Sequence, residues 1–206
     1  MAVAALLAAC GGESSSDSNE RAGTYQLEVT EANFPNEQRL GQTTLLRLAV
    51  KNAGDETVPA LTVTIGVGGE AGEGSSLPFG VHDASAGLAQ ADRPVWVLAE
   101  RYPRFAGSSK PAGASTSNKK TFAFGPLKPG ASATAIWKLS AVKAGDWKLN
   151  YRVGAGLGTQ VHAETPSGSA VGGTLVSTIT ADLPEVEVTD DGEVVDITSS
   201  GKRGSE

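Results

Sequence analysis

The sequence predicts an all-β fold, an antiparallel β-sandwich, on three observations. The 206-residue chain contains 18 Val and 17 Thr, whose branched side chains suit a pleated sheet. Apolar residues recur at every second position in several short segments, and clusters of Gly, Pro and Asn separate these segments. No segment beyond the first ten residues has a convincing helical period. The length suits one ordinary domain or two small ones, with a sizeable core.

The period of two is clear in four segments, which are residues 44–51, 61–67, 132–142 and 147–153. Alternation of apolar and polar side chains buries one face of a strand and exposes the other. The last of these strands is therefore expected to bury Trp147, Leu149, Tyr151 and Val153. Weaker strands are expected at residues 159–164 and 174–180.

A hairpin is expected at the end of the body, where Asp190-Asp191-Gly192 separates residues 186–189 from 193–197. Gly192 stands where a three-residue loop needs a left-handed backbone. We place the domain at residues 24–198, with a long inserted loop region at 68–120. A disordered polar tail is expected at 199–206.

The first ten residues end in Leu7-Ala8-Ala9-Cys10, which resembles a bacterial lipobox. This resemblance implies a signal peptide at residues 1–9 and a lipid on the Cys10 thiol, which would anchor the protein at the extracytoplasmic face of the bacterial cell membrane. Residues 10–23 are Ser-rich and predict a flexible tether. No Lys or Arg precedes the apolar run, so the natural start is expected upstream. The alternative is a buried N-terminal helix with a chance Cys.

Several segments of the body resemble bacterial Ig-like modules of the cell-adhesion-related (CARDB) type. The similar segments are residues 48–55 with an Asn-x-Gly turn, 61–65, 127–139 with a Pro-Gly turn, and 144–151. The resemblance covers residues 25–179 and implies an Ig-like β-sandwich. Such modules share no catalytic residues, so it implies no enzymatic activity.

The chain has few residues of the types that act as catalytic groups or metal ligands in other proteins. The only Cys is Cys10, which excludes a disulfide framework and cysteine catalysis. His82 and His162 lie far apart in the chain, and a metal site needs three or four convergent ligands. The Gly-rich residues 154–158 open no helix and contain no Gly-Lys-Ser/Thr, so we interpret them as a loop that binds no phosphate. We expect neither enzyme activity nor a cofactor or metal.

Charge is distributed unevenly along the chain. Residues 1–92 have 4 basic and 12 acidic residues (net −8), residues 93–152 have 11 and 2 (net +9), and residues 153–206 have 2 and 9 (net −7). One interpretation is that basic strands neutralise acidic neighbours across the sheet. The other is a basic surface that meets an anionic partner. Its candidate residues lie in or beside loops: Arg101, Tyr102, Arg104, Phe105, Lys110, Lys119 and Lys120. Lys138, Lys148 and Arg152 lie on regular strands, where pairing with acidic neighbours is expected.

The sequence therefore predicts a membrane-anchored lipoprotein that displays a non-catalytic Ig-like binding or structural module of the cell envelope. Its expected partners are the membrane, through the lipid on Cys10, and anionic lipid, an acidic wall polymer or an envelope protein; nucleic acid is not expected. The alternative is an extracytoplasmic solute- or metal-binding protein with a cupredoxin-like sandwich. A blue-copper site would need two His, a Cys and a Met, and the only Met is Met1.

Overall fold

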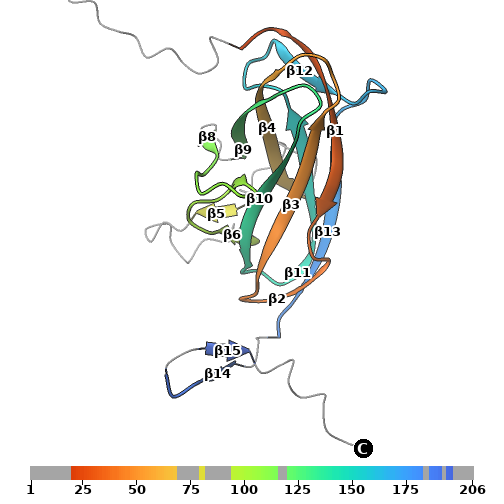
Figure 1. Cartoon of the computed structure of the whole chain (residues 1–206). Helices are drawn as coiled ribbons and strands as arrows, with labels where there is room; N and C mark the ends of the chain where they lie inside the picture. Colours follow the sequence, from red (N-terminus) through yellow and green to blue (C-terminus); the bar gives the residue numbers. More distant parts are fainter. Residues whose placement is uncertain are drawn as a thin grey trace, which may run out of the picture.

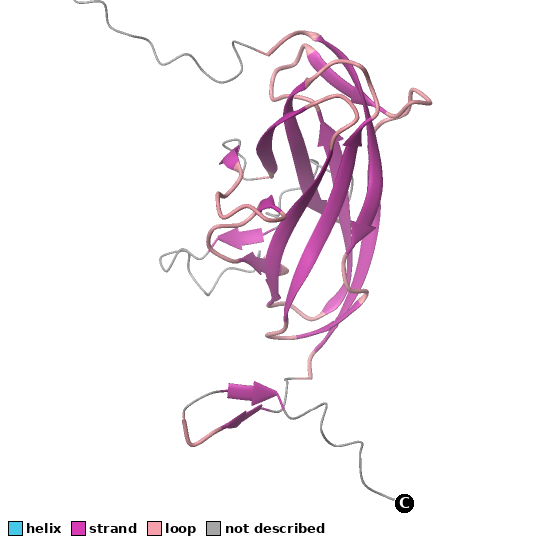
Figure 2. Ribbon diagram, viewed as in Figure 1, coloured by secondary structure: helices cyan, strands magenta, loops and turns pink. Residues whose placement is uncertain are grey.

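The computed structural model describes residues 20–68, 79–81, 94–115, 120–182, 186–191 and 194–196. All regular secondary structure in these ranges is β-strand. Two curved sheets pack face to face (Figure 2). The prediction of an all-β sandwich is confirmed. No helix among the described residues is long and apolar enough to cross a membrane. Cys10, the predicted signal peptide and the predicted C-terminal tail lie outside the described residues.

The first sheet has seven strands. Along its path it contains β12 (Val161–Glu164), β1 (Gly23–Asn33), β3 (Thr43–Asn52), β10 (Ser132–Ala141), β6 (Trp96–Leu98) and β5 (Phe79–Val81), and β7 (Arg104–Phe105) also pairs with β10. The second sheet has six strands, in the order β2 (Glu37–Arg39), β13 (Gly172–Thr180), β11 (Gly145–Gly154), β4 (Val58–Val67), β9 (Thr121–Leu127) and β8 (Gly113–Ser115).

The sheets are mainly antiparallel, as expected, but three pairs at their margins are parallel. These pairs are β1–β12, β2–β13 and β5–β6. The chain passes from β11 in the second sheet to β12 in the first and back to β13 in the second. Because of this crossing between the sheets, β12 lies beside the start of β1 and runs parallel to it. Rules for local hairpins, which join antiparallel strands, do not predict this pairing.

The strands form where the sequence alternates. Leu46, Leu48 and Val50 of β3 are fully buried, and Trp137 of the central strand β10 is buried with them. β9 was missed by the sequence analysis because Gly125 and Pro126 interrupt its pattern. Gly125 has φ +99°, and the pairing of β9 with β4 shifts register beside it. A bulge of this kind lets an irregular sequence stay in a sheet.

One expectation for the core was wrong in part. Leu149, Tyr151 and Val153 of β11 are buried, but Trp147 is only half-buried at the end of the strand. Its indole Nε1 donates to the Lys143 carbonyl oxygen at 3.2 Å, and the Lys143 ammonium lies 5.2 Å from the ring centroid. Trp147 therefore packs at the edge of the core and does not lie in its centre.

The described parts of the predicted insertion, residues 68–120, close one side of the sandwich. β6 and β7 pair with β10 of the first sheet, and β8 pairs with β9 of the second. Figure 1 shows β5, β6 and β8 gathered on one side, with β1 and β13 on the other. Aromatic contacts fill the closed side, with ring centroids of Phe105 and Phe124 at 5.2 Å and of Phe122 and Trp137 at 6.0 Å.

The C-terminal hairpin was expected and is present. β14 (Val186–Val188) and β15 (Val194–Asp196) pair antiparallel, and the register joins Val188 to Val194. This register agrees with the turn that was expected between the two strands. Among the described strands, β14 and β15 pair only with each other.

Candidate functional site

The candidate interaction residues lie mainly on one described segment of the insertion, residues 94–115, which we call the arm. The arm runs antiparallel along β10: Leu98 pairs with Leu139, and Phe105 pairs with Ala135. Between β6 and β7 it makes a tight turn in which Arg101 has φ 62°. Arg101 is exposed and makes no side-chain hydrogen bond or ion pair with any described residue, so its guanidinium group is available to a partner.

Arg104 is held by its neighbour Tyr102. Its Nη2 donates to the Tyr102 hydroxyl at 2.9 Å, and its Cζ lies 4.6 Å from the Tyr102 ring centroid. Stacking and hydrogen bonding of this kind fix the guanidinium plane. Arg104 is therefore a positioned cation at the surface of the arm.

The aromatic residues of the arm serve the fold more than the sequence analysis expected. Tyr102 and Phe105 are half-buried and pack against the hydrophobic core, and Phe105 contacts Phe124 of the other sheet. They were expected as exposed anchors beside Arg101 and Arg104. Because their rings cover core surface, only their edges are open to a partner.

Sheet register brings further basic residues beside the arm. Ile136 of β10 pairs with Arg104 on one side and with Arg47 of β3 on the other, so the three side chains lie on the same outer face of the first sheet. Lys138 follows two residues along β10 and is exposed on that face. Arg47 could not be predicted as a member of this group, because it lies in the acidic first part of the chain and only the strand register places it beside Arg104.

Lys110 joins this group, whereas Lys120 does not. An antiparallel bridge between Arg104 and Pro111 places Lys110 beside the strand that carries Arg104. Lys120 immediately precedes β9 of the second sheet, where its carbonyl oxygen accepts a hydrogen bond from Ile65. Lys119 lies outside the described residues. We define the basic face as Arg47, Arg101, Arg104, Lys110 and Lys138.

The expectation that strand-borne basic residues pair with acidic neighbours was wrong. Lys138 lies opposite Leu45, Lys148 opposite Val176, and Arg152 opposite Gly172 and Thr64. Between described residues, the structure has one ion pair, in which Arg21 Nη1 lies 3.8 Å from Glu56 Oε2. Both side chains are exposed. Cross-strand neutralisation therefore does not account for the basic residues on β10 and β11.

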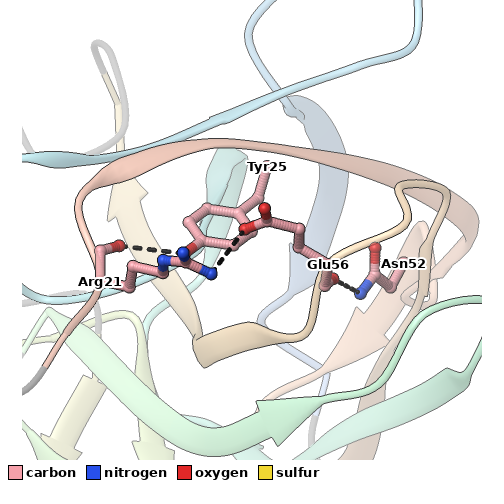
Figure 3. Close-up of polar contacts among 4 residues, drawn as sticks. All are labelled: Arg21, Tyr25, Asn52 and Glu56. Carbon is pink, nitrogen blue, oxygen red and sulfur yellow. Dashed lines mark hydrogen bonds and ion pairs between the residues drawn. The ribbon is translucent and has the colours of Figure 1, made fainter.

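A second candidate is a cleft of about 790 Å³ where β1 begins, lined by residues 21–26 and 52–56. Figure 3 shows its polar contacts: the Tyr25 hydroxyl donates to the Arg21 carbonyl oxygen at 3.0 Å, and Asn52 Nδ2 donates to the Glu56 carbonyl oxygen at 2.8 Å. Asn52 Nδ2 also donates to the Leu127 carbonyl oxygen at 2.9 Å. Tyr25 and Asn52 thus spend their hydrogen-bond donors on backbone carbonyl oxygens of the domain.

Next to this cleft, the Gly-rich residues 154–158 bind an anion of the chain itself. The backbone N–H groups of Leu157 and Gly158 donate to the Glu20 carboxylate at 2.7–3.0 Å. A Cβ at position 156 would lie 2.5 Å from Glu20 Oε2, so glycine there leaves room for the carboxylate. The loop was expected to bind no phosphate, and its two donors hold Glu20. We call this contact the Glu20 clamp.

The histidines give no support to a metal site. His162 is exposed on β12, and His82 lies outside the described residues. No group of three or more His, Cys, Asp or Glu that could hold a metal occurs among the described residues.

No protein-family model matches the chain, and none of the curated proteins compared with it matches. Among solved structures, the chain is similar to the CARDB domain of the PF1109 protein from Pyrococcus furiosus, in complex with di-metal ions: TM-score 0.40 and 12% identity over 75% of this chain and 86% of that chain.

Two further similarities concern other kinds of protein. Native E. coli alpha-2-macroglobulin has TM-score 0.40 and 15% identity over 78% of this chain, which spans only 7% of that protein. The archaellum periplasmic stator protein FlaG from Sulfolobus acidocaldarius has TM-score 0.32 and 18% identity, over 73% of this chain and 99% of that one. At these scores and identities the likeness assigns no activity, and the CARDB-type module expected from the sequence is among the structures to which the chain is similar.

Proposed function

We propose that the protein is a lipid-anchored, non-catalytic binding module of the bacterial cell envelope that attaches to anionic surfaces through its basic face. The observation that carries this proposal is that basic side chains from separate parts of the chain gather at one surface. Residues from three separate segments, namely β3, β10 and the arm, place basic side chains on and beside one outer face of the first sheet. The protein as a whole has a net charge of −6, so this local concentration of positive charge runs against its average.

The chemistry of the basic face suits phosphate-bearing lipid headgroups. Arg101, Lys110 and Lys138 are exposed, and Arg104 is oriented by Tyr102. A basic residue near an anionic membrane surface contributes about 1 kcal/mol to attachment, and salt weakens the attraction. Guanidinium groups also form bidentate hydrogen bonds with phosphate.

Charge reversal on the basic face tests this proposal. The double variant Arg101→Glu with Lys110→Glu is expected to lower partition of the lipid-free domain onto anionic phospholipid vesicles by more than about ten-fold, because each reversal removes one attraction and adds one repulsion. Binding of the parent domain should weaken between low salt and 0.15 M, where the Debye length is about 8 Å. Vesicle sedimentation measures both effects.

A matched control keeps net charge equal. Lys148→Glu with Arg152→Glu makes the same change on exposed positions of β11 in the second sheet and should leave vesicle binding close to that of the parent. Equal losses in both double variants would show that only net charge matters. If the parent binds a soluble acidic wall polymer and no vesicle at low salt, the partner is the polymer and the membrane proposal is wrong.

Anchoring is the second part of the proposal and rests on the lipobox at Cys10. In this proposal the Glu20 clamp marks the place where the tether would meet the domain. Beyond the clamp, the Gly23 N–H donates to the Gln160 carbonyl oxygen at 3.0 Å, and β1 pairs with β12 from Gly23 onward. These contacts fix the point at which the chain enters the domain.

Cys10→Ala tests the anchor in cells. The variant is expected to lose its lipid and to leave the membrane fraction, because Cys10 carries the only thiol in the sequence. Metabolic labelling with a clickable fatty acid and cell fractionation measure the two effects. Ala9→Ser is a suitable control, since it keeps a small residue before the Cys. A Cys10→Ala protein that stays in the membrane fraction and resists a high-salt wash would contradict lipid anchoring.

A further inference from the structure

The side of the sandwich opposite the arm is open. β12 covers β1 only over Gly23–Gln26, and β2 covers β13 only over Thr178–Thr180. Among the described strands, nothing pairs with the outer edges of β1 at residues 28–32 or of β13 at residues 172–177. The two uncovered edges lie next to each other, one from each sheet (Figure 1). Uncovered edges present backbone N–H and C=O groups that can pair with another strand.

A groove of about 310 Å³ lies between these edges. It is lined by Glu28, Val29, Thr30, Glu31, Ala32, Tyr151, Thr165, Ala170, Val171 and Gly172. Its walls are thus the edge of β1 and the start of β13, with the β12–β13 connection at one end. A groove flanked by two free strand edges has the shape that an extended peptide requires.

Tyr151 places an unpaired hydroxyl in this groove. The side chain is only 8% exposed, yet its Oη has no hydrogen-bond partner among the described residues. The hydroxyl lies against Gly173, where a Cβ would be 2.7 Å from Oη. Burial raises the pKa of the Tyr151 phenol above 10.0, so the group remains a proton donor. The fully buried side-chain polar atoms without a partner in the described part of the chain are Thr44 Oγ1 and Trp137 Nε1, so the Tyr151 Oη keeps contact with solvent and is accessible to an acceptor that enters the groove.

The edge of β13 lacks the usual protection. Charged side chains, Pro and bulges normally keep edge strands from pairing with other chains. The sequence of β13, Gly-Gly-Thr-Leu-Val-Ser-Thr-Ile-Thr, has no charged residue and no Pro, and Val176 is 58% exposed. The strand is uncharged, exposes Val176 and reaches the groove at Gly172, and these are features of a pairing site.

We propose that this open side binds an extended peptide segment of a partner protein, which adds as a strand to the edge of β13 and carries basic side chains. The peptide backbone pairs with residues 172–177, and one of its carbonyl oxygens accepts the hydrogen bond from Tyr151. Its basic side chains meet Glu28 and Glu31, which are exposed on β1 and form no ion pair within the described residues. This site shares no residue with the basic face.

Charge decides between a partner peptide and a second copy of the chain. Pairing of two β13 edges would bring Glu28 and Glu31 of both copies together, and each copy has a net charge of −6. Like charges placed opposite each other disfavour association. A peptide with basic side chains is attracted by the carboxylates of Glu28 and Glu31. We therefore assign the site to such a peptide of a partner protein.

The probe for this site is a synthetic, fluorescently labelled heptapeptide of alternating Val and Lys, added to the soluble domain. Fluorescence anisotropy should show saturable binding, at least about ten-fold tighter than that of the same peptide with Glu in place of Lys. The same Val-Lys peptide with N-methylated backbone amides, which keeps the charge but cannot pair as a strand, should bind at least about ten-fold more weakly too.

Two variants locate the binding. Tyr151→Phe keeps the ring and breaks no existing hydrogen bond, so the melting temperature should stay unchanged while affinity for the Val-Lys peptide falls at least about three-fold. Glu28→Gln with Glu31→Gln should lower it about ten-fold. The controls are Tyr25→Phe and Asp55→Asn with Glu56→Gln, which make the same substitutions in the other cleft. They remove the Tyr25–Arg21 hydrogen bond and the Arg21–Glu56 ion pair, but they should leave peptide affinity unchanged.

Three results would overturn the proposal. The first is no binding of the Val-Lys peptide at millimolar concentration. The second is equal binding of the N-methylated peptide, which would indicate charge attraction without strand pairing. The third is a dimer in sedimentation equilibrium that Tyr151→Phe and Val176→Lys both weaken, which would assign the edge of β13 to a second copy.

Discussion

Trp137→Ala is expected to lower the free energy of unfolding by about 3–5 kcal/mol, the usual loss for a large buried aromatic residue. Trp137 is fully buried on the central strand β10, and it forms edge contacts with Phe122 at 6.0 Å and Phe124 at 5.5 Å. Both partners belong to β9 of the opposite sheet, so the cavity would open between the sheets. A loss of this size is a large share of the 5–15 kcal/mol that stabilises a typical domain. Urea unfolding followed by circular dichroism measures it.

Trp147→Ala is the matched control for this prediction. It removes the same side chain from a half-buried position at the end of β11, and about 1–2 kcal/mol should be lost with one partly buried hydrogen bond. The sequence pattern alone would assign the larger loss to Trp147. If both variants lose the same free energy of unfolding, Trp137 of β10 does not lie at the centre of the core.

Asn52→Asp is expected to destabilise the domain by at least about 3–5 kcal/mol, the usual range for an unpaired buried charge. Asn52 is fully buried, and its Nδ2 donates to the carbonyl oxygens of Glu56 and Leu127, while its Oδ1 accepts from the Gly54 N–H. A carboxylate is isosteric but accepts only, so two buried carbonyl oxygens would face it without a donor. Differential scanning calorimetry near neutral pH measures the loss.

Asn33→Asp is the control for Asn52→Asp, because Asn33 is exposed at the end of β1 and makes no side-chain hydrogen bond with a described residue. Its effect should stay within about 0.5 kcal/mol, as for most surface substitutions. A melting temperature of Asn52→Asp that matches the parent would mean that the Asn-x-Gly turn does not depend on the side-chain amide.

The arm illustrates what could be predicted of the candidate site. Local composition identified Arg101, Arg104 and Lys110 as exposed or accessible basic residues, and the structure places these three near one another. Arg47 and Lys138 could not be assigned, because their neighbours come from strands far away in sequence. Tyr102 and Phe105 were misjudged for the same reason: whether an aromatic side chain is exposed depends on what packs over it, here Phe124 and the rest of the core.

The sequence by itself determined the fold class, the inner faces of β3, β4 and β10, most of the inner face of β11, and the register of the C-terminal hairpin. These properties follow from side-chain alternation and turn residues within short segments, and they need no knowledge of distant neighbours. Only the tertiary structure decided which strands lie side by side, and hence the basic face, the Glu20 clamp and the groove beside Tyr151. Each joins residues remote in sequence: Arg47 meets Arg104 through Ile136, Glu20 meets Gly158, and β1 meets β13. Pairings of this range depend on the packing of the whole chain, which no local pattern encodes.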